Sequence, residues 1–234
     1  MSKIDEAKEP SLQEKECSSR KPRLLDCFCG MGGISDGFAL EGFDVTGIDI
    51  VDAPKMLGYK HKFIRADMHE TSGSRFCGYD VIWGSPPCRD FCELARLVGH
   101  LWKNPPNPEK GIELVNDFFL FVKIAKPTFW ILENNPSLAR YINAKPRMTK
   151  TLIGETMKRS FWGNFPLFLM PSDSRKKKLT ERNSTGKGPS HMRVNGKIPK
   201  HESWERAKIP LACSRAFAKA CREALELEIL EIKT

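Results

Sequence analysis

Short apolar runs separated by polar or glycine-containing stretches recur along most of the chain. Such runs, bounded by glycine, proline or acids, are typical of buried strands, and apolar residues at helical spacing between them predict amphipathic helices. The predicted strands are residues 23–28, 45–49, 62–66, 79–83, 129–133 and 161–170, the last being a strand or a hairpin arm. The predicted helices are residues 34–41, 112–126 and 149–159, and a closing helix that begins at Pro210 and runs through Leu225. Alternating strands and helices predict an α/β fold with a Rossmann-like sheet.

The chain has 234 residues, of which 40% are hydrophobic, enough for one α/β domain with its own core. We predict a disordered lead-in over 1–22, a core domain over 23–171, a short basic segment over 172–208 and a helix over 209–234 that returns to the core. No apolar run is long enough for a membrane span, and the N-terminal residues have no apolar centre typical of a signal peptide. We therefore expect an intracellular protein, in the cytoplasm or the nucleoid.

Cysteine usage favours reduced thiols. None of the eight cysteines forms a CxxC pair, and no signal peptide accompanies them. His191, His201 and Cys213 have a spacing that matches no known metal motif. We expect no metal site and no disulfide framework.

Positive charge is concentrated near one part of the chain. The net charge is +9, and residues 173–208 hold eleven Lys/Arg against four Asp/Glu. Such a segment suits a polyanion, and nucleic-acid phosphates are the usual one; a solvated basic loop is the alternative. The candidate phosphate-binding residues of this segment are Arg175, Lys176, Lys177, Lys178 and Arg182.

A glycine-rich turn joins the first predicted strand to the first predicted helix. Glycines at 30, 32 and 33 let the backbone approach a ligand, and the helix supplies free amides. Asp49 ends the next strand, 16 residues after Gly33, where a carboxylate can accept the hydroxyls of a ribose. Asp67 ends the third strand, where it can bind an adenine amino group or cap the next helix. The pattern predicts a nucleotide-type cofactor site.

The fourth predicted strand ends at Gly84 and leads into Ser85-Pro86-Pro87-Cys88. Two prolines hold the backbone stiffly and place the thiol of Cys88 at the carboxyl end of a strand, where α/β sheets keep their ligands. Cys88 can be a nucleophile there, or a buried structural cysteine. Residues 89–110 follow, with several prolines, and are typical of a functional loop or lid.

Three strand ends carry the motifs in order: residues 28–33 (Phe-Cys-Gly-Met-Gly-Gly), 85–88 (Ser-Pro-Pro-Cys) and 133–135 (Glu-Asn-Asn). Together they resemble the cytosine-C5 DNA methyltransferases, whose signatures are FxGxGG, PPC or PCQ, and ENV. The resemblance covers about residues 24–170. It implies a class I methyltransferase sheet with helices on both faces and a short recognition insertion. It also implies a DNA substrate, with RNA as the alternative polymer, and we expect a monomer.

The resemblance assigns roles to individual residues. Cys88 would add to C6 of cytosine, which makes C5 nucleophilic, and Glu133 would bind ring N3 and the exocyclic amine. A thiol cannot stack on a base, which argues against the amino-methylating enzymes, which put an aromatic residue at that place. S-adenosylmethionine would be held by Phe28, Gly30, Met31, Gly33, Asp49, Ile50, Asp67, Met68 and Pro86.

The chain departs from the family pattern at three places. Arg89-Asp90-Phe91-Cys92 replaces the usual Gln-x-Phe-Ser, and Asn135 replaces a valine. The family's QxRxR strand, whose arginines help to hold the base and its phosphates, has no match at residues 162–166. Arg159, Arg175 and Arg182 are the candidates for that role, and Arg89 is a further candidate for nucleic-acid binding. An RNA enzyme of the same chemistry and a non-catalytic nucleic-acid-binding protein remain as alternatives.

Overall fold

The computed structural model describes residues 20–91, 105–153, 155, 158–171 and 207–232. Its centre is one sheet with the strand order β3-β2-β1-β4-β5-β7-β6. The strands are β1 (Arg23–Cys27), β2 (Asp44–Asp49), β3 (Lys62–Arg65), β4 (Val81–Gly84), β5 (Phe129–Asn134), β6 (Met148–Thr151) and β7 (Lys158–Asn164). β1 to β5 pair in parallel, and β7 runs antiparallel to both of its neighbours, β5 and β6. This topology confirms the predicted Rossmann-like α/β fold.

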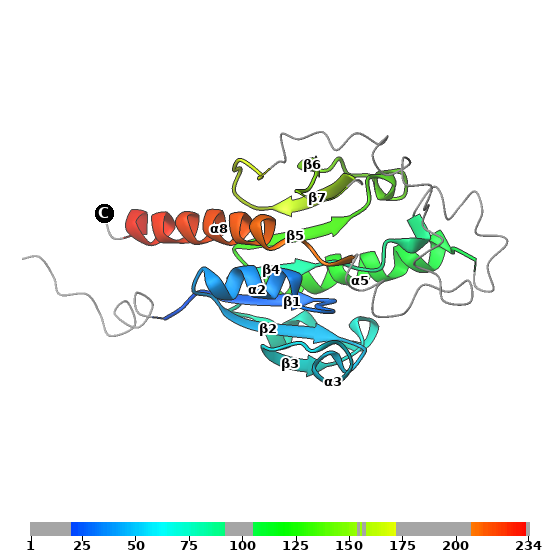
Figure 1. Cartoon of the computed structure of the whole chain (residues 1–234), viewed down its shortest axis with the longest axis horizontal. Helices are drawn as coiled ribbons and strands as arrows, with labels where there is room; N and C mark the ends of the chain where they lie inside the picture. Colours follow the sequence, from blue (N-terminus) through cyan, green and yellow to red (C-terminus); the bar gives the residue numbers. More distant parts are fainter. Residues whose placement is uncertain (1–19, 92–104, 154, 156–157, 172–206, 233–234) are drawn as a thin grey trace, which may run out of the picture.

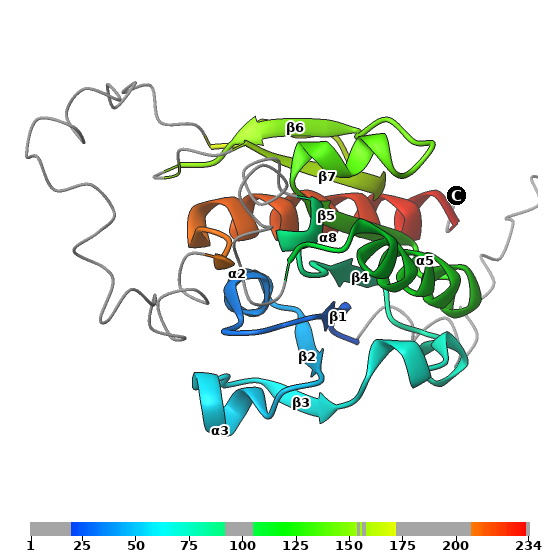
Figure 2. The ribbon, with the colours of Figure 1, turned by 90° about the vertical axis from the view of Figure 1, so that its right-hand side faces the viewer.

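Helices cover both faces of the sheet (Figures 1 and 2). The α-helices are α2 (Gly33–Leu40), α3 (Ala53–Leu57), α5 (Pro108–Ala125) and α8 (Leu211–Ile232), and the short 3-10 helices are η1 (Met68–Glu70), η2 (Gly73–Phe76), η3 (Arg89–Phe91) and η5 (Pro136–Arg140). α2 and α8 pack together on one face, and α5 covers the other. The prediction of helices on both faces is confirmed.

Apolar side chains that point alternately to the two faces of the sheet form one hydrophobic core on each face. Leu24 packs with Trp83 and Phe217 on the side of α2 and α8. Leu25, the next residue, packs with Phe118 on the side of α5. Because successive side chains of a strand point to opposite faces, strands buried on both sides read as continuous apolar runs. That is why the sequence pattern located β1, β4 and β5.

The predicted helix over residues 149–159 is wrong. Residues 148–151 form β6, and β7 starts at residue 158. Thr149 and Thr151 alternate with lysine, and branched residues on alternate positions fit a strand better than a helix. The Thr149 and Ser160 hydroxyls hydrogen-bond across the two strands at 2.7 Å. The strand predicted over 161–170 ends at Asn164, shortly before Pro166.

Two helix starts differ slightly from the predictions. α5 begins at Pro108, because the side chain of Asn107 accepts from the Lys110 amide at 3.0 Å and caps the helix. α8 begins at Leu211, one residue after Pro210. The predictions for residues 1–19 and for 172–206, which include Arg175, Lys176, Lys177, Lys178 and Arg182, lie outside the described residues.

Candidate active site

The predicted motifs meet at one edge of the sheet. β1, β4 and β5 are neighbours and parallel, so the residues that follow them lie side by side at their carboxyl ends. The turn that carries Cys88 therefore lies between the glycine turn and Glu133. The sheet reverses its strand order between β1 and β4, the position where open α/β sheets bind ligands.

The glycine turn depends on left-handed backbone. Phe28, Gly30 and Gly32 have φ values of 62°, 49° and 79°. A side chain at Gly30 or Gly32 would make that conformation unfavourable. Gly33 serves packing instead, because a Cβ there would lie 2.9 Å from the backbone N of Ile209. Its small size lets α2 approach the segment that leads into α8.

Asp49 closes the turn from the end of β2. One of its carboxylate oxygens accepts from Gly30 N at 3.0 Å, and the other accepts from Val51 N at 3.1 Å. Burial raises the pKa of Asp49, and the amides of Gly30, Val51 and Ile50 act in the opposite direction. The carboxylate is thus fixed beside the backbone turn, with one oxygen on each side.

The other predicted cofactor residues differ in exposure. Ile50 is 58% exposed, an apolar side chain next to the buried Asp49. Met68 is buried and packs in the core on the side of α5. Asp67 caps η1, because its side chain accepts from His69 N at 3.0 Å. The capping alternative is therefore observed, and the adenine contact stays a prediction.

A buried polar group that the sequence analysis missed lies under the turn. Asp26 accepts from both the backbone N and the hydroxyl of Ser35, at 3.2 and 2.6 Å, and that hydroxyl also hydrogen-bonds Tyr59 at 2.8 Å. Burial raises the pKa of Asp26 to about 7, partly offset by the bonds from Ser35. These contacts tie β1 to the first turn of α2. An acid inside an apolar run is the signal that could have revealed it.

The Pro-Pro-Cys turn is held at its start, by contacts of Ser85 and Pro86. Ser85 N donates to Cys27 O at 3.3 Å, and its hydroxyl accepts from the indole of Trp83 at 2.8 Å. Asn134 Nδ2 donates to Pro86 O at 3.0 Å. Cys88 is exposed, so the alternative of a buried structural cysteine is wrong. The turn is a fixed platform that presents the thiol.

Glu133 is buried at the end of β5 and is held by a cation. Arg159 Nη1 donates to Glu133 Oε1 at 3.1 Å. The same guanidinium bonds Glu155 through Nε and Nη2, at 3.0 and 2.9 Å. Burial raises the pKa of Glu133, whereas Arg159 and the hydroxyl of Ser85 lower it. The carboxylates of Glu133 and Glu155 therefore hold the guanidinium of Arg159 between them, and Glu133 is the acid predicted to bind the base.

Residues 23–158, more than half of the chain, match the family model of the C-5 cytosine-specific DNA methylases. The chain belongs to this family. It is 27% identical over 134 residues to the Type II methyltransferase M1.HphI of Haemophilus parahaemolyticus, covering 53% of this chain and 35% of the relative. It is 29% identical over 116 residues to M.FnuDI of Fusobacterium nucleatum, covering 48% and 32%. The chain thus spans about a third of these relatives.

The fold also resembles solved structures at low identity. A putative DNA modification methyltransferase encoded within an E. coli prophage is 19% identical, with a TM-score of 0.46, over 61% of this chain and 46% of that one. This similarity is too weak to carry an argument about function. The family assignment rests on the match over residues 23–158.

Arg159 is one of the arginines proposed from the sequence, and it lies beside Glu133. We placed the arginine-bearing strand at residues 162–166 and found no arginine there. The strand beside β5 is β7, which starts at residue 158. Residues 160–164 of β7 pair with β5, and Arg159 comes just before them and pairs with Lys150 of β6. One of the candidate arginines therefore contacts the predicted catalytic acid. Glu155, which holds it, was not identified from the sequence.

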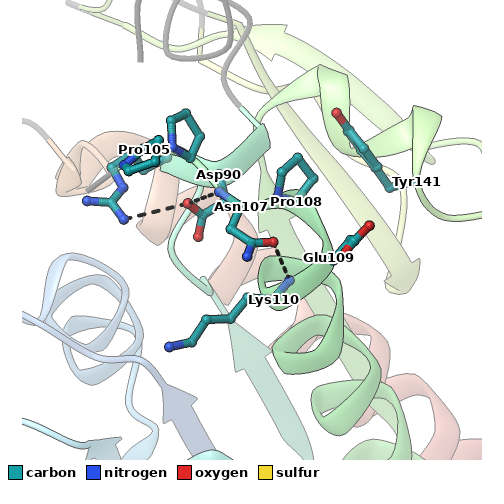
Figure 3. A pocket seen from close by; sticks show the side chains of 9 residues that line it. Asp90, Pro105, Asn107, Pro108, Glu109, Lys110 and Tyr141 are labelled. Atoms are coloured by element: carbon teal, nitrogen blue, oxygen red, sulfur yellow. Dashed lines mark hydrogen bonds and ion pairs between the residues drawn. The ribbon is translucent and has the colours of Figure 1, made fainter. Parts of the chain in front are cut away.

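Arg89 directly follows the cysteine and lines a cavity whose other lining residues include Asp90 and Tyr141, which are labelled in Figure 3. The cavity has a volume of about 840 Å³ and is lined mainly by Arg89, Asp90, Pro105, Asn107, Lys110 and Tyr141. Arg89 forms an ion pair with Asp90 at 3.6 Å. Most of the predicted loop over 89–110 lies outside the described residues. The cavity thus has a cation and an aromatic ring, Arg89 and Tyr141, in its lining.

The described residues hold no group of three or more His, Cys, Asp or Glu that could bind a metal. Of the three residues considered from the sequence, Cys213 is buried in the core and both histidines lie outside the described residues. No helix in the described part of the chain is long and apolar enough to cross a membrane.

Proposed function

We propose that this chain transfers a methyl group from S-adenosylmethionine to C5 of cytosine in DNA, through a transient bond between Cys88 Sγ and ring C6. The observation that carries the proposal is the exposed Cys88 on a fixed turn, flanked by the glycine turn and by the Glu133–Arg159 pair. Membership in the methylase family supports the same chemistry. The same membership supports DNA as the proposed substrate.

The described residues fit S-adenosylmethionine. A left-handed glycine turn exposes backbone, Asp49 offers carboxylate oxygens at the adjacent strand end, and Ile50 offers an exposed apolar side chain for a purine face. When bound there, the cofactor supplies an electrophilic methyl group. Phe28, Gly30, Met31 and Asp49 would hold it beside the Cys88 turn.

The protein side of the reaction begins at Cys88. Its thiolate adds to C6, and the electron pair of the C5–C6 double bond moves toward the ring carbonyl and N3. Glu133 binds N3, and because burial raises its pKa it can hold a proton there closer to neutral pH than an ordinary glutamate. C5 then takes the methyl group as the bond from that methyl group to the sulfonium sulfur breaks, which would leave S-adenosylhomocysteine as the product.

Release restores the aromatic ring and the thiol. A base removes the proton from C5, the C5–H electrons re-form the double bond to C6, and the sulfur leaves as a thiolate. Arg159 remains beside Glu133 throughout and stabilises its ionised form once the proton has moved. The chain thus supplies nucleophile, acid and a positioned cation.

Methyl transfer from labelled S-adenosylmethionine tests the proposal. DNA and RNA that contain cytosine are assayed side by side, with cytosine-free polymers as controls. We expect label in DNA, at C5 of cytosine, and its loss in Cys88→Ala. Label in RNA alone would mean that RNA, and not DNA, is the substrate. Binding of cofactor and DNA without any methyl transfer would favour a non-catalytic protein.

A further inference from the structure

The edge of the sheet beyond Glu133 is strongly basic. Residues 134–154 contain four Lys/Arg and no Asp or Glu. These cations are Arg140, Lys145, Arg147 and Lys150, and all are exposed, as is Lys158 at the start of β7. We call Arg140, Lys145, Arg147, Lys150 and Lys158 the basic edge.

Lys150 and Lys158 lie at the end of the sheet where Glu133 lies, Lys150 on the face of Arg159 and Lys158 on the opposite face. In the antiparallel pair β6–β7, Lys150 stands opposite Arg159 and Thr151 opposite Lys158. Opposed residues in such a pair share a face of the sheet, so Lys150 lies on the same face as Arg159. β7 continues beside β5 with Ser160 opposite Asn134. Both lysines are therefore at the edge where the predicted motifs meet.

Arg159 and these lysines differ in their charge partners. Arg159 is bound by Glu133 and Glu155, but no carboxylate of the described residues pairs with Lys150 or Lys158. Lysines on an exposed edge strand also prevent unwanted strand pairing, which would account for Lys150 on β6. It does not account for Lys158, because β7 lies between β5 and β6. A polyanionic ligand accounts for both.

We propose that Lys150 and Lys158 bind phosphates of the target strand beside the cytosine that enters the Cys88–Glu133 site. The inference rests on the proposed function. A base in a duplex has to leave the stack to reach an enzyme's catalytic groups, and the backbone on either side must then be held. Lys150 and Lys158, which no carboxylate of the described residues neutralises, can bind the phosphates of that backbone. They contact the backbone, so they act at every target sequence.

The test compares Lys150→Gln/Lys158→Gln with a control double variant, Lys123→Gln/Lys126→Gln. The control lysines are exposed as well but lie at the end of α5, by the amino ends of the strands. DNA affinity is measured against salt concentration, with cofactor affinity and thermal unfolding measured to show an intact fold. We expect the slope of log affinity against log salt to fall by about 0.9 for each lysine in the first variant and to stay unchanged in the control. Lys150→Arg/Lys158→Arg keeps the charge and should restore the slope.

Each outcome decides the proposal. If the parent protein methylates DNA and the Lys150→Gln/Lys158→Gln variant keeps its salt slope, the basic edge makes no phosphate contact, and the proposed function stands. If the salt slope falls equally in both double variants, the effect comes from net charge, and the assignment of phosphate contacts to Lys150 and Lys158 is wrong. If the parent binds no DNA, the proposal fails together with the proposed function.

Discussion

Arg159, near the start of β7, donates to the buried carboxylate of Glu133 at the end of β5, with 3.1 Å between Nη1 and Oε1. The two strands are antiparallel neighbours, so the contact follows from the register of the sheet. Glu155 holds the other side of the guanidinium. The contact therefore sets both the orientation and the ionisation of the proposed catalytic acid.

Replacing Arg159 by Ala should raise the pKa of Glu133 further, because the neighbouring positive charge lowers it. In the proposed reaction Glu133 acts while protonated, so activity should fall as pH rises through that pKa. The falling limb of the pH–rate profile should move to higher pH in the variant, and the rate should drop by roughly 100-fold or more. Arg159→Lys, which keeps the charge without the planar fork, should move the limb less. If the falling limb stays at the same pH in the variant, Arg159 does not set the pKa of Glu133, which would contradict the prediction.

Asp26 should make stability depend on pH. Its pKa in the fold is about 7, against an ordinary value of 3.8, so the folded protein holds this proton more tightly than the unfolded chain. Stability from this group is full below about pH 4 and is lost as pH rises through about 7, by up to about 4 kcal/mol. Denaturant unfolding at several pH values, compared with Asp26→Asn, measures it. Parallel pH curves for the two proteins would contradict the assignment.

Asp49→Ala should weaken the binding of S-adenosylmethionine by roughly 1.5–3 kcal/mol, the worth of a hydrogen bond to a charged group. Calorimetric titration measures this. Asp44→Ala is the matched control, an acid at the opposite end of the same strand that pairs with Lys62 on the surface. Equal affinity in Asp49→Ala and Asp44→Ala would remove Asp49 from the cofactor site.

Gly163 sets how closely β7 approaches β5. A Cβ at this position would lie 2.0 Å from the carbonyl oxygen of Trp130, and φ is 135°. Gly163→Ala should therefore destabilise the fold by roughly 1–3 kcal/mol beyond the conformational strain and displace Arg159 from Glu133. Gly42→Ala is the control, since its φ is also positive, at 91°, and a Cβ there meets nothing within 4 Å. Similar midpoints in urea unfolding for both variants would contradict this view of the contact.

The sequence predicted those parts of the site that local pattern determines. Asp49, Cys88 and Glu133 each follow an apolar strand, and parallel strands bring their carboxyl ends to one edge. Arg159 could be named only as a candidate, because its contact with Glu133 depends on which strands are neighbours and in which register. The spacing of apolar residues in a single sequence does not indicate which strands are neighbours or in which register they pair.

The errors have a similar physical origin. The hydrogen bonds between Asp26 and Ser35 join residues nine apart on different elements, and nothing in the apolar pattern of β1 marks them. Residues 149–159 show helix-compatible apolar spacing, yet β6 and β7 form there because β7 pairs with β5 and β6 pairs with β7. Tertiary pairing overrides local propensity in such places.

Trapping with DNA whose target cytosine carries fluorine at C5 tests the central claim most directly. Methyl transfer can proceed, but fluorine cannot leave C5 as a cation, so the bond from Cys88 to C6 should persist. We expect mass spectrometry of the denatured protein to show protein plus oligonucleotide plus one methyl group, mapped to the peptide with Cys88. The adduct should vanish in Cys88→Ser, whose hydroxyl is scarcely ionised at neutral pH, and remain in Cys77→Ser, which alters another exposed thiol. An adduct that persists in Cys88→Ser, or that maps to Cys92, would contradict the account.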